Sequence, residues 1–378
     1  MTTEPVELSE VIRVHYGSAL KEAERDQSGA HEVFGSAGVV GHHSEALFDY
    51  PSIVIGRKGS VGSVTYAPNG GWAIDTAFFV ERLEPKSSDL RYLFHALKNA
   101  RLAQHTITTS IPGLSRDDIY RTRVRLPPLP EQRRIADLLD KADAIRRKRK
   151  EAIALTEELL RSAFLEMFGD PVTNAMGWPT ASLGDEAEQM KYGTSEKCDA
   201  SEGAGMPVLR IPNVVGGLVD WNDLKYAALS EKETRDLRLR AGDLLFVRSN
   251  GNPAYIARCA VVSDSDERRG GLFASYLIRV RLRSGRLLPR YVAAALSAES
   301  YRAKLTREAR TTAGNYNIST EGLRRLIMPA PPIAQQAQFA KLVDSTRSAI
   351  SRQADGLAQA EDLFNSLVAR AFSGGLAA

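Results

Sequence analysis

Two long stretches of the chain place apolar residues at the spacing of a helix. Residues 131–168 contain no glycine or proline, and the apolar positions there are Ile135, Leu138, Ala142, Ile145, Ala152, Leu159 and Ala163. A second series, broken by a few polar residues, runs through Phe339, Leu342, Ala349, Leu357, Ala360, Phe364, Leu367 and Ala371. Steps of three and four residues predict two long helices that pack on each other through a narrow, coiled-coil seam. At ~1.5 Å per residue, the first helix would be about 57 Å long.

The remaining sequence has the pattern of short strands and shorter helices. Runs rich in β-branched residues, bounded by Gly, Pro, Asn or Asp, lie at 53–55, 61–66, 77–80, 208–211, 244–247, 260–262 and 276–282. Helical patterns follow at 90–102 and 290–304. We therefore predict an α+β fold in which two mixed α+β domains (1–126 and 171–330) are separated by two long helical segments (127–170 and 331–378).

The chain also repeats itself at a constant offset. The sequence PPLPEQRRIA from Pro127 recurs as PPIAQQAQFA from Pro331, and 331 − 127 = 204. At the same offset Phe168 corresponds to Phe372. Upstream the likeness is looser, as in Tyr-Gly-Ser at Tyr16 and Tyr-Gly-Thr at Tyr192. A pseudo-two-fold internal repeat of this kind indicates one scaffold used twice, carrying two surfaces that have diverged independently.

Composition narrows the classes of function. With 50 basic and 46 acidic residues the net charge is +4, which permits binding to nucleic acid without requiring it. Cys198 and Cys259 are isolated, so no structural zinc site is predicted. The opening residues MTTEPVELSEVIRV lack the apolar core of a signal peptide, and no run of ~18 apolar residues occurs. We expect a cytoplasmic protein without a membrane segment.

Several motifs resemble catalytic sites only weakly. The segment GRKGSVG from Gly56 lacks the GKS or GKT ending of a P-loop, and a strand–turn–strand is favoured instead. NPAY from Asn252 lacks the second proline of the Asn-Pro-Pro-Tyr loop of adenine methyltransferases. Asp75 with Glu84 and Lys86 fits only the loosest nuclease pattern, and His42-His43 has no third metal ligand. We predict no catalytic residue and no metal site in this chain.

Polar residues that follow the predicted strands suit nucleic acid better. Arg248 and Asn250 are residue types that read guanine and adenine edges, and the hydroxyl and amide groups of 311–317 suit phosphates or bases. An ordinary solvated turn is the competing interpretation for each residue. The predicted DNA-binding residues are Ser36, His42, Arg57, Lys58, Ser60, Thr108, Thr109, Ser110, Arg248, Ser249, Asn250, Asn252, Tyr255, Thr312, Asn315, Tyr316 and Asn317.

The repeated Pro-Leu-Pro-Glu-Gln element that opens a long helix, together with Gly242-Asp243-Leu244-Leu245 before Arg248, resembles the specificity subunits of type I restriction–modification systems. The resemblance implies two target-recognition domains that each read half of a bipartite double-stranded DNA site, with the two helices packed antiparallel as a spacer between them. It also implies two methyltransferase subunits that use S-adenosylmethionine, and translocase–nuclease subunits that use ATP and magnesium. No cofactor is implied for this chain.

The same resemblance implies a surface for these partner subunits at the helix ends. Its residues would be Glu131, Gln132, Arg133, Phe168, Gln335, Gln336 and Phe372. One departure is that Gln335 stands where the first copy has Glu131.

Arg248→Ala is expected to weaken one half-site only, by ~1–3 kcal/mol if the contact is bidentate.

Three other interpretations stay open. The chain could be the specificity subunit of a type IIB-like enzyme whose partner fuses methylase and nuclease, which the neighbouring gene would decide. It could be an enzyme that acts on nucleic acid by itself, which incubation with DNA, magnesium and S-adenosylmethionine would test. It could be a coiled-coil interaction scaffold, which a gel-shift assay with and without methyltransferase subunits would distinguish.

Overall fold

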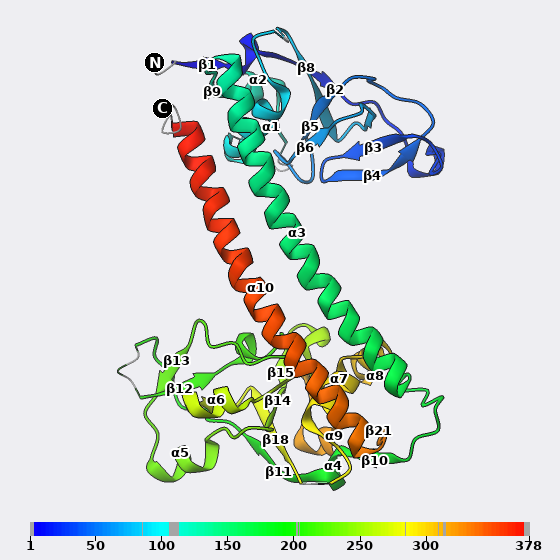
Figure 1. The fold of residues 1–378 in the computed structure, drawn as a ribbon, viewed down its shortest axis with the longest axis vertical. Coiled ribbons are helices and arrows are strands. Elements are labelled where there is room, and N and C mark those ends of the chain that lie inside the picture. Colours follow the sequence, from blue (N-terminus) through cyan, green and yellow to red (C-terminus); the bar gives the residue numbers. More distant parts are fainter. Residues whose placement is uncertain are drawn as a thin grey trace. The chain divides into compact units, whose positions relative to one another are not determined.

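The computed structural model describes residues 4–84, 86–105, 113–201, 203, 205–283, 285–308, 310–312 and 315–373. The chain divides into two compact units: unit 1 is Met1–Glu151 with Ala354–Ala378, and unit 2 is Ala152–Gln353. Each unit contains one globule and half of each long helix. These helices are α3 (Leu129–Phe168) and α10 (Ile333–Ser373), so both predicted long helices are present (Figure 1). The four-segment division drawn from the repeat stays a prediction, since the units follow contacts instead.

The globule of unit 1 is built on two small sheets. A four-stranded sheet has the order β2-β8-β5-β6, a three-stranded sheet has the order β4-β3-β7, and β1 pairs with β9. The elements are β1 (Pro5–Glu7), β2 (Ile12–Tyr16), β3 (His31–Gly35), β4 (Gly38–His43), β5 (Ser52–Gly56), β6 (Val64–Ala67), β7 (Trp72–Ala73), β8 (Ala77–Arg82), α1 (Leu90–Asn99), α2 (Arg116–Tyr120) and β9 (Arg123–Arg125).

The globule of unit 2 repeats this topology. Its four-stranded sheet has the order β11-β18-β14-β16, its second sheet β13-β12-β17, and β10 pairs with β21. The elements are β10 (Thr180–Ser182), α4 (Leu183–Glu186), β11 (Ala187–Tyr192), β12 (Met206–Leu209), β13 (Lys225–Ala227), α5 (Glu231–Leu237), β14 (Leu244–Val247), β15 (Ser249–Asn250), β16 (Cys259–Val261), α6 (Asp264–Arg269), β17 (Leu272–Phe273), β18 (Leu277–Leu282), α7 (Pro289–Ser297), α8 (Glu299–Glu308), β19 (Arg310–Thr312), β20 (Asn315–Asn317), α9 (Thr320–Arg324) and β21 (Ile327–Pro329).

The two four-stranded sheets have equivalent central strands. Every residue of β5 (Ser-Ile-Val-Ile-Gly) and of β14 (Leu-Leu-Phe-Val) is buried, because each strand has packed side chains on both faces. One parallel pair joins β3 to β7 in unit 1, and the equivalent parallel pair joins β12 to β17 in unit 2. The shared strand order confirms the α+β class and the internal two-fold repeat.

A buried glutamine attaches the start of α3 to the globule of unit 1. Gln132 is fully buried, and its Oε1 accepts the N–H of Asp89 at 2.8 Å. Its Nε2 donates to the carbonyls of Ser87 and Pro127 at 2.9 and 2.7 Å. All three bonds satisfy main-chain groups that burial would otherwise leave unpaired.

The start of α10 is attached to unit 2 in the same way. Gln336 is fully buried, accepts the N–H of Leu288 at 2.8 Å, and donates to the carbonyls of Arg286 and Pro331, both at 2.7 Å. Gln132 and Gln336 were expected on a partner surface. Their burial instead gives them a role within this chain, and a partner cannot reach them.

The end of each long helix packs against the globule at which the other helix begins. Phe372 of α10 lies 5.6 Å, centroid to centroid, from Tyr92 in unit 1, and Phe168 of α3 lies 5.0 Å from Tyr291 in unit 2. Within each unit the two helices therefore run antiparallel. Phe168 is 1% exposed, so it too belongs to the interior rather than to the partner surface expected for it.

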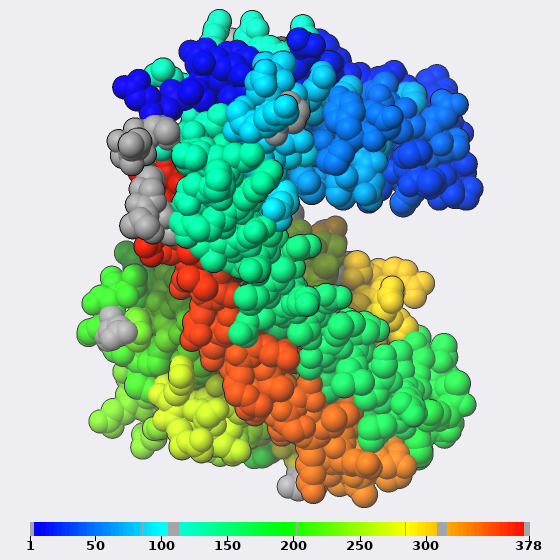
Figure 2. Space-filling model, turned by 45° about the horizontal axis from the view of Figure 1, so that its top comes forward, coloured from blue at the N-terminus to red at the C-terminus, as the bar shows by residue number. Residues whose placement is uncertain are grey.

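The seam between the two helices agrees with the predicted one only in part. Ile145 and Leu159, both predicted seam positions, are 50% and 59% exposed. The predicted position Phe364 does contact the other helix in unit 1, where the guanidinium of Arg146 lies 4.9 Å from its ring centroid. In unit 2 the helices meet through Phe164 and Phe339, whose centroids are 5.5 Å apart; Figure 2 shows α10 (orange) beside the last turns of α3 (green). The apolar stripe alone did not fix the rotation of the helices about their axes.

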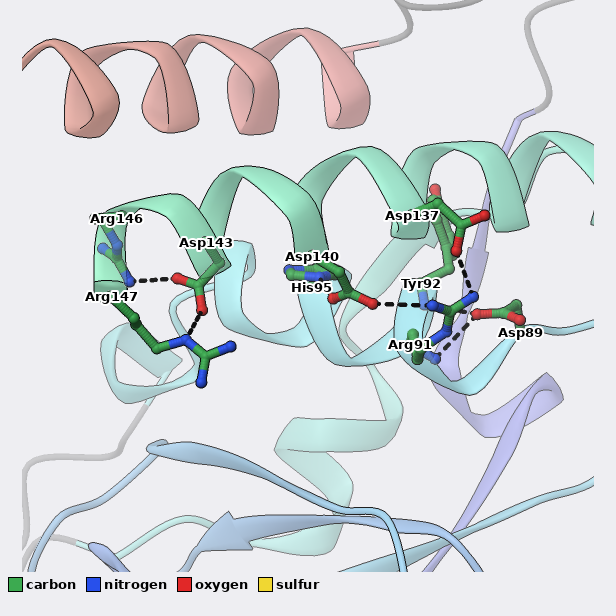
Figure 3. A network of polar contacts seen from close by, with 9 residues as sticks. All are labelled: Asp89, Arg91, Tyr92, His95, Asp137, Asp140, Asp143, Arg146 and Arg147. Atoms are coloured by element: carbon green, nitrogen blue, oxygen red, sulfur yellow. Dashed lines mark hydrogen bonds and ion pairs between the residues drawn. The ribbon is translucent and has the colours of Figure 1, made fainter. Parts of the chain in front are cut away.

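A polar network joins α1 to the first turns of α3 (Figure 3). Arg91 donates to Asp137 at 2.7 Å and to Asp140 at 3.1 Å, and Asp140 also contacts His95 Nε2 at 2.7 Å. In unit 2 the pair Arg290–Asp344, at 2.8 Å, takes the place of Arg91–Asp140. These polar contacts therefore join the first turns of each long helix to a shorter helix of its globule.

The buried His95 in this network predicts a pH dependence. Burial lowers the pKa of His95 below its ordinary 6.5, although Asp140 and Asp143 oppose the shift, and Lys98 adds to it. The folded state then binds fewer protons than the unfolded state, so stability falls as pH drops through 6.5 toward the lowered value. Urea unfolding at pH ~7.5 and ~5.5 is expected to show this loss in the wild type. His95→Gln, which keeps a donor toward Asp140, should reduce it; an equal loss in both proteins would contradict the assignment.

Candidate nucleic-acid interface

In unit 2 a three-stranded sheet of order β15-β20-β19 contains six of the nine DNA-binding residues predicted for that unit. Ser249 pairs with Asn317, and Asn250 with Tyr316. Thr312 and Asn315 face each other in the adjoining ladder, although their side chains lie outside the described part. Two segments more than sixty residues apart in the sequence therefore lie side by side in one small sheet.

Arg248, which directly precedes β15, is held by four contacts. Its N–H donates to the carbonyl of Tyr276 at 2.9 Å, and its carbonyl accepts the N–H of Ile318 at 2.9 Å. Its Nη1 donates to the carbonyl of Ser275 at 3.3 Å, and its guanidinium carbon lies 4.7 Å from the ring centroid of Tyr192. The side chain is thus fixed at the surface without a carboxylate partner among the described residues.

Arg57, at the end of β5, has the same four contacts in unit 1. Its N–H donates to the carbonyl of Thr76 at 2.8 Å, and its carbonyl accepts the N–H of Leu114 at 3.0 Å. Its Nη1 donates to the carbonyl of Asp75 at 3.3 Å, and its guanidinium carbon lies 5.0 Å from the ring centroid of Tyr16. Arg57 and Arg248 therefore occupy equivalent positions, although most residues around them differ.

The residues after each arginine differ between the units. Lys58, exposed, forms an antiparallel bridge with Gly113, whereas Ser249 forms the equivalent bridge with Asn317. Gly59 has φ +76°, and a Cβ there would approach Ser36 Oγ to 3.3 Å, so Ser36 lies beside this turn. Ser60 is exposed on the same turn. The predicted strand–turn–strand is thus confirmed, with β5 and β6 on either side.

Six other predicted positions need separate description. His42 pairs with Glu32, at the far end of the β3–β4 hairpin from Ser36, so it is not brought to the Arg57 turn. Asn252 Oδ1 accepts the N–H of Ala254 and caps a 3-10 turn, and Tyr255 on that turn is 36% exposed beside Arg258. Thr108, Thr109 and Ser110 lie outside the described residues.

Sequence reasoning missed the aromatic partners of the two arginines. Tyr16 and Tyr192 are 49% and 37% exposed, and each ends the first strand of its sheet. In unit 1, Arg116 adds a second guanidinium 4.6 Å from the Tyr16 centroid. In unit 2, Thr320 N–H donates to the Tyr192 hydroxyl at 3.2 Å. The available signal was the repeated Tyr-Gly pair, which shows equivalence but not a role.

The pKa of Tyr192 reflects the contacts of its hydroxyl and its ring. Burial of the phenol raises its pKa, but the hydrogen bonds from Thr320 and the positive charge of Arg248 outweigh burial, so the pKa of Tyr192 is lowered overall. The Thr320 N–H thus orients the phenol whose ring contacts the Arg248 guanidinium.

Within the described residues, the weaker catalytic motifs do not converge. Asp75 precedes β8 and Glu84 follows it, so the whole strand separates the two carboxylates. No group of three or more His, Cys, Asp or Glu side chains could hold a metal ion in the part of the chain that is described. Burial raises the pKa of the Cys259 thiol to about 12, which keeps it protonated and unreactive. No described helix is both long and apolar enough to cross a membrane.

Known proteins are similar to this chain in sequence and in fold. Residues 2–155 match the family model described as type I restriction modification DNA specificity domain. The chain is 30% identical over 271 residues to the type I restriction enzyme EcoKI specificity subunit of Escherichia coli (strain K12), covering 68% of this chain and 58% of that protein. It is 22% identical over 270 residues to the StySPI specificity subunit of Salmonella potsdam, with the same coverage. The alignments thus span less than two thirds of these relatives' length.

The fold agrees with that of a solved structure. The S subunit of a type I restriction–modification system from M. genitalium superposes with a TM-score of 0.67 at 14% identity, covering 98% of this chain and 96% of that one. At this identity the likeness concerns the fold. From the family model and the sequence relatives, we conclude that the chain belongs to the family of type I restriction–modification specificity subunits.

Proposed function

We propose that this chain is the non-catalytic DNA-recognition subunit of a type I restriction–modification complex, and that each unit reads one half of a bipartite double-stranded site in the major groove. The observation that carries this proposal is the repeated polar surface beside Arg57 and Arg248. The two units share a topology, and their surface residues there differ, as two readers of unlike half-sites require.

Base discrimination in unit 2 is assigned to the sheet of β15, β20 and β19. Ser249 and Asn317 pair across β15 and β20, so their side chains lie on one face of this sheet, and an amide side chain bonds to an adenine edge in two places. In unit 1 the exposed Lys58 and Ser60 occupy the equivalent turn. These side chains offer direct contacts to bases, whereas main-chain groups and other basic side chains position the duplex.

A pair of equivalent exposed leucines supports the proposal that two partner subunits dock on this chain. Leu159 on α3 and Leu363 on α10 correspond in the 204-residue repeat and are 59% and 55% exposed. Leu159 belongs to unit 2 and Leu363 to unit 1, so each unit offers one such position. We assign these positions, with the exposed Arg133, to the docking of two methyltransferase subunits.

Of the remaining partner residues, Glu131 is engaged within the chain. Arg134 donates to both Glu131 oxygens, at 2.7 and 2.8 Å, and this contact lowers the pKa of Glu131. Gln335 and Phe372 stay in the proposal as rim positions. S-adenosylmethionine, ATP and magnesium belong, in this proposal, to the partner subunits. A type IIB-like partner that fuses methylase and nuclease is the alternative, and the neighbouring gene distinguishes the two.

The spacer role of the helices gives a sharp test. Seven residues inserted after Glu151 of α3 and seven after Gln353 of α10 add two helical turns to both helices where the units meet. At ~1.5 Å per residue and ~3.4 Å per base pair, the spacer between the methylated half-sites should lengthen by about three base pairs. Methylome sequencing of cells that carry the complete system measures this.

The two half-site sequences should stay as they are, because neither globule is altered. Replacing residues 152–158 by seven helix-forming residues, without a change in length, is the matched control and should leave the spacer unchanged. An unchanged spacer in the insertion variant that still methylates would overturn the spacer role. If methylation in cells with the wild-type system does not depend on this chain, the proposed function is overturned.

A further inference from the structure

Arg57 and Arg248 are the most closely matched polar residues of the two surfaces. In both units the main-chain N–H, the main-chain carbonyl and Nη1 have equivalent partners, with distances that agree within 0.1 Å. The guanidinium lies 5.0 Å from the Tyr16 centroid in one unit and 4.7 Å from the Tyr192 centroid in the other. The neighbouring side chains have meanwhile changed, from Lys58 to Ser249.

This combination separates two tasks. Side chains that discriminate unlike half-sites must differ between the units, whereas a group that meets what both half-sites share can stay the same. What every DNA half-site shares is its sugar–phosphate backbone. An arginine fixed by a ring and a carbonyl has already lost its rotamer freedom, and its other N–H donors suit a phosphate.

Resting on the proposed function, we infer that Arg57 and Arg248 each bind a backbone phosphate of their half-site, with Tyr16 and Tyr192 as the positioning residues that hold the guanidinium. Base discrimination then falls to the residues that differ, including Lys58 and Ser249. This assignment replaces the expectation that Arg248 reads a base. In unit 1, Arg116 on the same tyrosine extends the positive charge.

The experiment measures DNA binding by the full chain assembled with its methyltransferase subunits. The probes are a duplex that carries the methylated site mapped in cells, and a scrambled duplex of equal length. Arg57→Gln and Arg248→Gln should each reduce the slope of log affinity against log salt by about one. Between ~50 and ~200 mM salt, the wild type should therefore lose about three- to fourfold more affinity than either variant. Both duplexes should be affected alike, and the methylated sequence should not change.

Two further variants test the positioning role of the ring. Tyr192→Phe keeps the aromatic face and should bind like the wild type, whereas Tyr192→Leu removes it and should reproduce part of the Arg248→Gln defect. Arg248→Lys keeps the charge and should retain the salt slope. Arg161→Gln is the matched charge control, because Arg161 is exposed on α3 and pairs only with Glu158 among the described residues; its slope should equal that of the wild type.

The outcomes separate this inference from the proposed function. A relaxed base preference at one position with an unchanged salt slope would make Arg57 or Arg248 a base reader and overturn the inference alone. A lower melting temperature with unchanged slope and sequence preference would leave them a folding role, which also overturns it. Equal, weak binding of the wild type to both duplexes would overturn the proposed function, and the inference with it.

Discussion

Replacement of Asp243 by alanine is expected to lower the free energy of unfolding by about 3–5 kcal/mol. Asp243 is fully buried and accepts Nε and Nη2 of Arg281, both at 2.7 Å, and the N–H of Arg240 at 2.8 Å. Arg279 is 1% exposed, with its Nε 4.0 Å from the same carboxylate. Removal of the carboxylate would leave two arginines partly or fully buried without an opposite charge, and burial already lowers the pKa of Arg279.

Urea unfolding followed by circular dichroism measures the loss. The matched control is Ser52→Ala, because Ser52 begins β5 as Asp243 precedes β14, and its hydroxyl donates to the carbonyl of Val80 at 2.7 Å. The hydroxyl oxygen also accepts the N–H of Val80 at 3.1 Å, so loss of these two neutral bonds should cost about 1–2 kcal/mol. If Asp243→Ala is no more destabilising than Ser52→Ala, the buried charge has another partner and our account is wrong.

Gln132→Ala is expected to destabilise the chain by about 3 kcal/mol. The change removes both polar atoms that satisfy the N–H of Asp89 and the carbonyls of Ser87 and Pro127, all close to the start of α3. Gln336→Ala should have an effect of similar size in unit 2, since Gln336 makes the same three bonds.

Arg133→Ala is the control for Gln132→Ala, because Arg133 is exposed on the next position of the same helix. It should change the free energy of unfolding by less than ~0.5 kcal/mol. The Gln132 and Arg133 variants also separate two roles that the motif alone does not distinguish, namely stability of the chain and binding of the partner. If co-purification with methyltransferase subunits weakens in the Arg133 variant while stability holds, the exposed residue serves the partner. A stable Gln132 variant would refute the structural role of the glutamine.

The internal repeat predicted more about the candidate DNA-binding site than the individual motifs did. Arg57 and Arg248 were each selected for their residue type, and the Tyr-Gly pair was selected as a mark of duplication. That the two arginines stack on these two tyrosines could not be inferred, because the contact joins the end of one strand to the end of another through the sheet order β2-β8-β5 or β11-β18-β14. Sheet order depends on long-range packing, which local patterns do not record.

The predicted partner surface shows what motif recognition alone could not determine. The Pro-Leu-Pro-Glu-Gln motif was recognised, but a motif does not say which of its side chains point inward. Gln132 and Gln336 are polar, and polar residues are mostly exposed, so a surface role was the natural expectation. Their amides are buried because three main-chain groups converge at each helix start, and that convergence exists only in the folded chain.

By itself the sequence determined the two long helices, the mixed α+β globules, the duplication and the family. These follow from residue periodicity, from glycine and proline positions and from self-similarity, which are properties of the chain read in order. The tertiary structure alone decided the rotation of α3, which exposes Leu159, and the pairing of Ser249 with Asn317. It also decided the equivalence of the contacts around Arg57 and Arg248. Those outcomes depend on which distant segments pack together, because burial and hydrogen bonding are settled only when the whole core has formed.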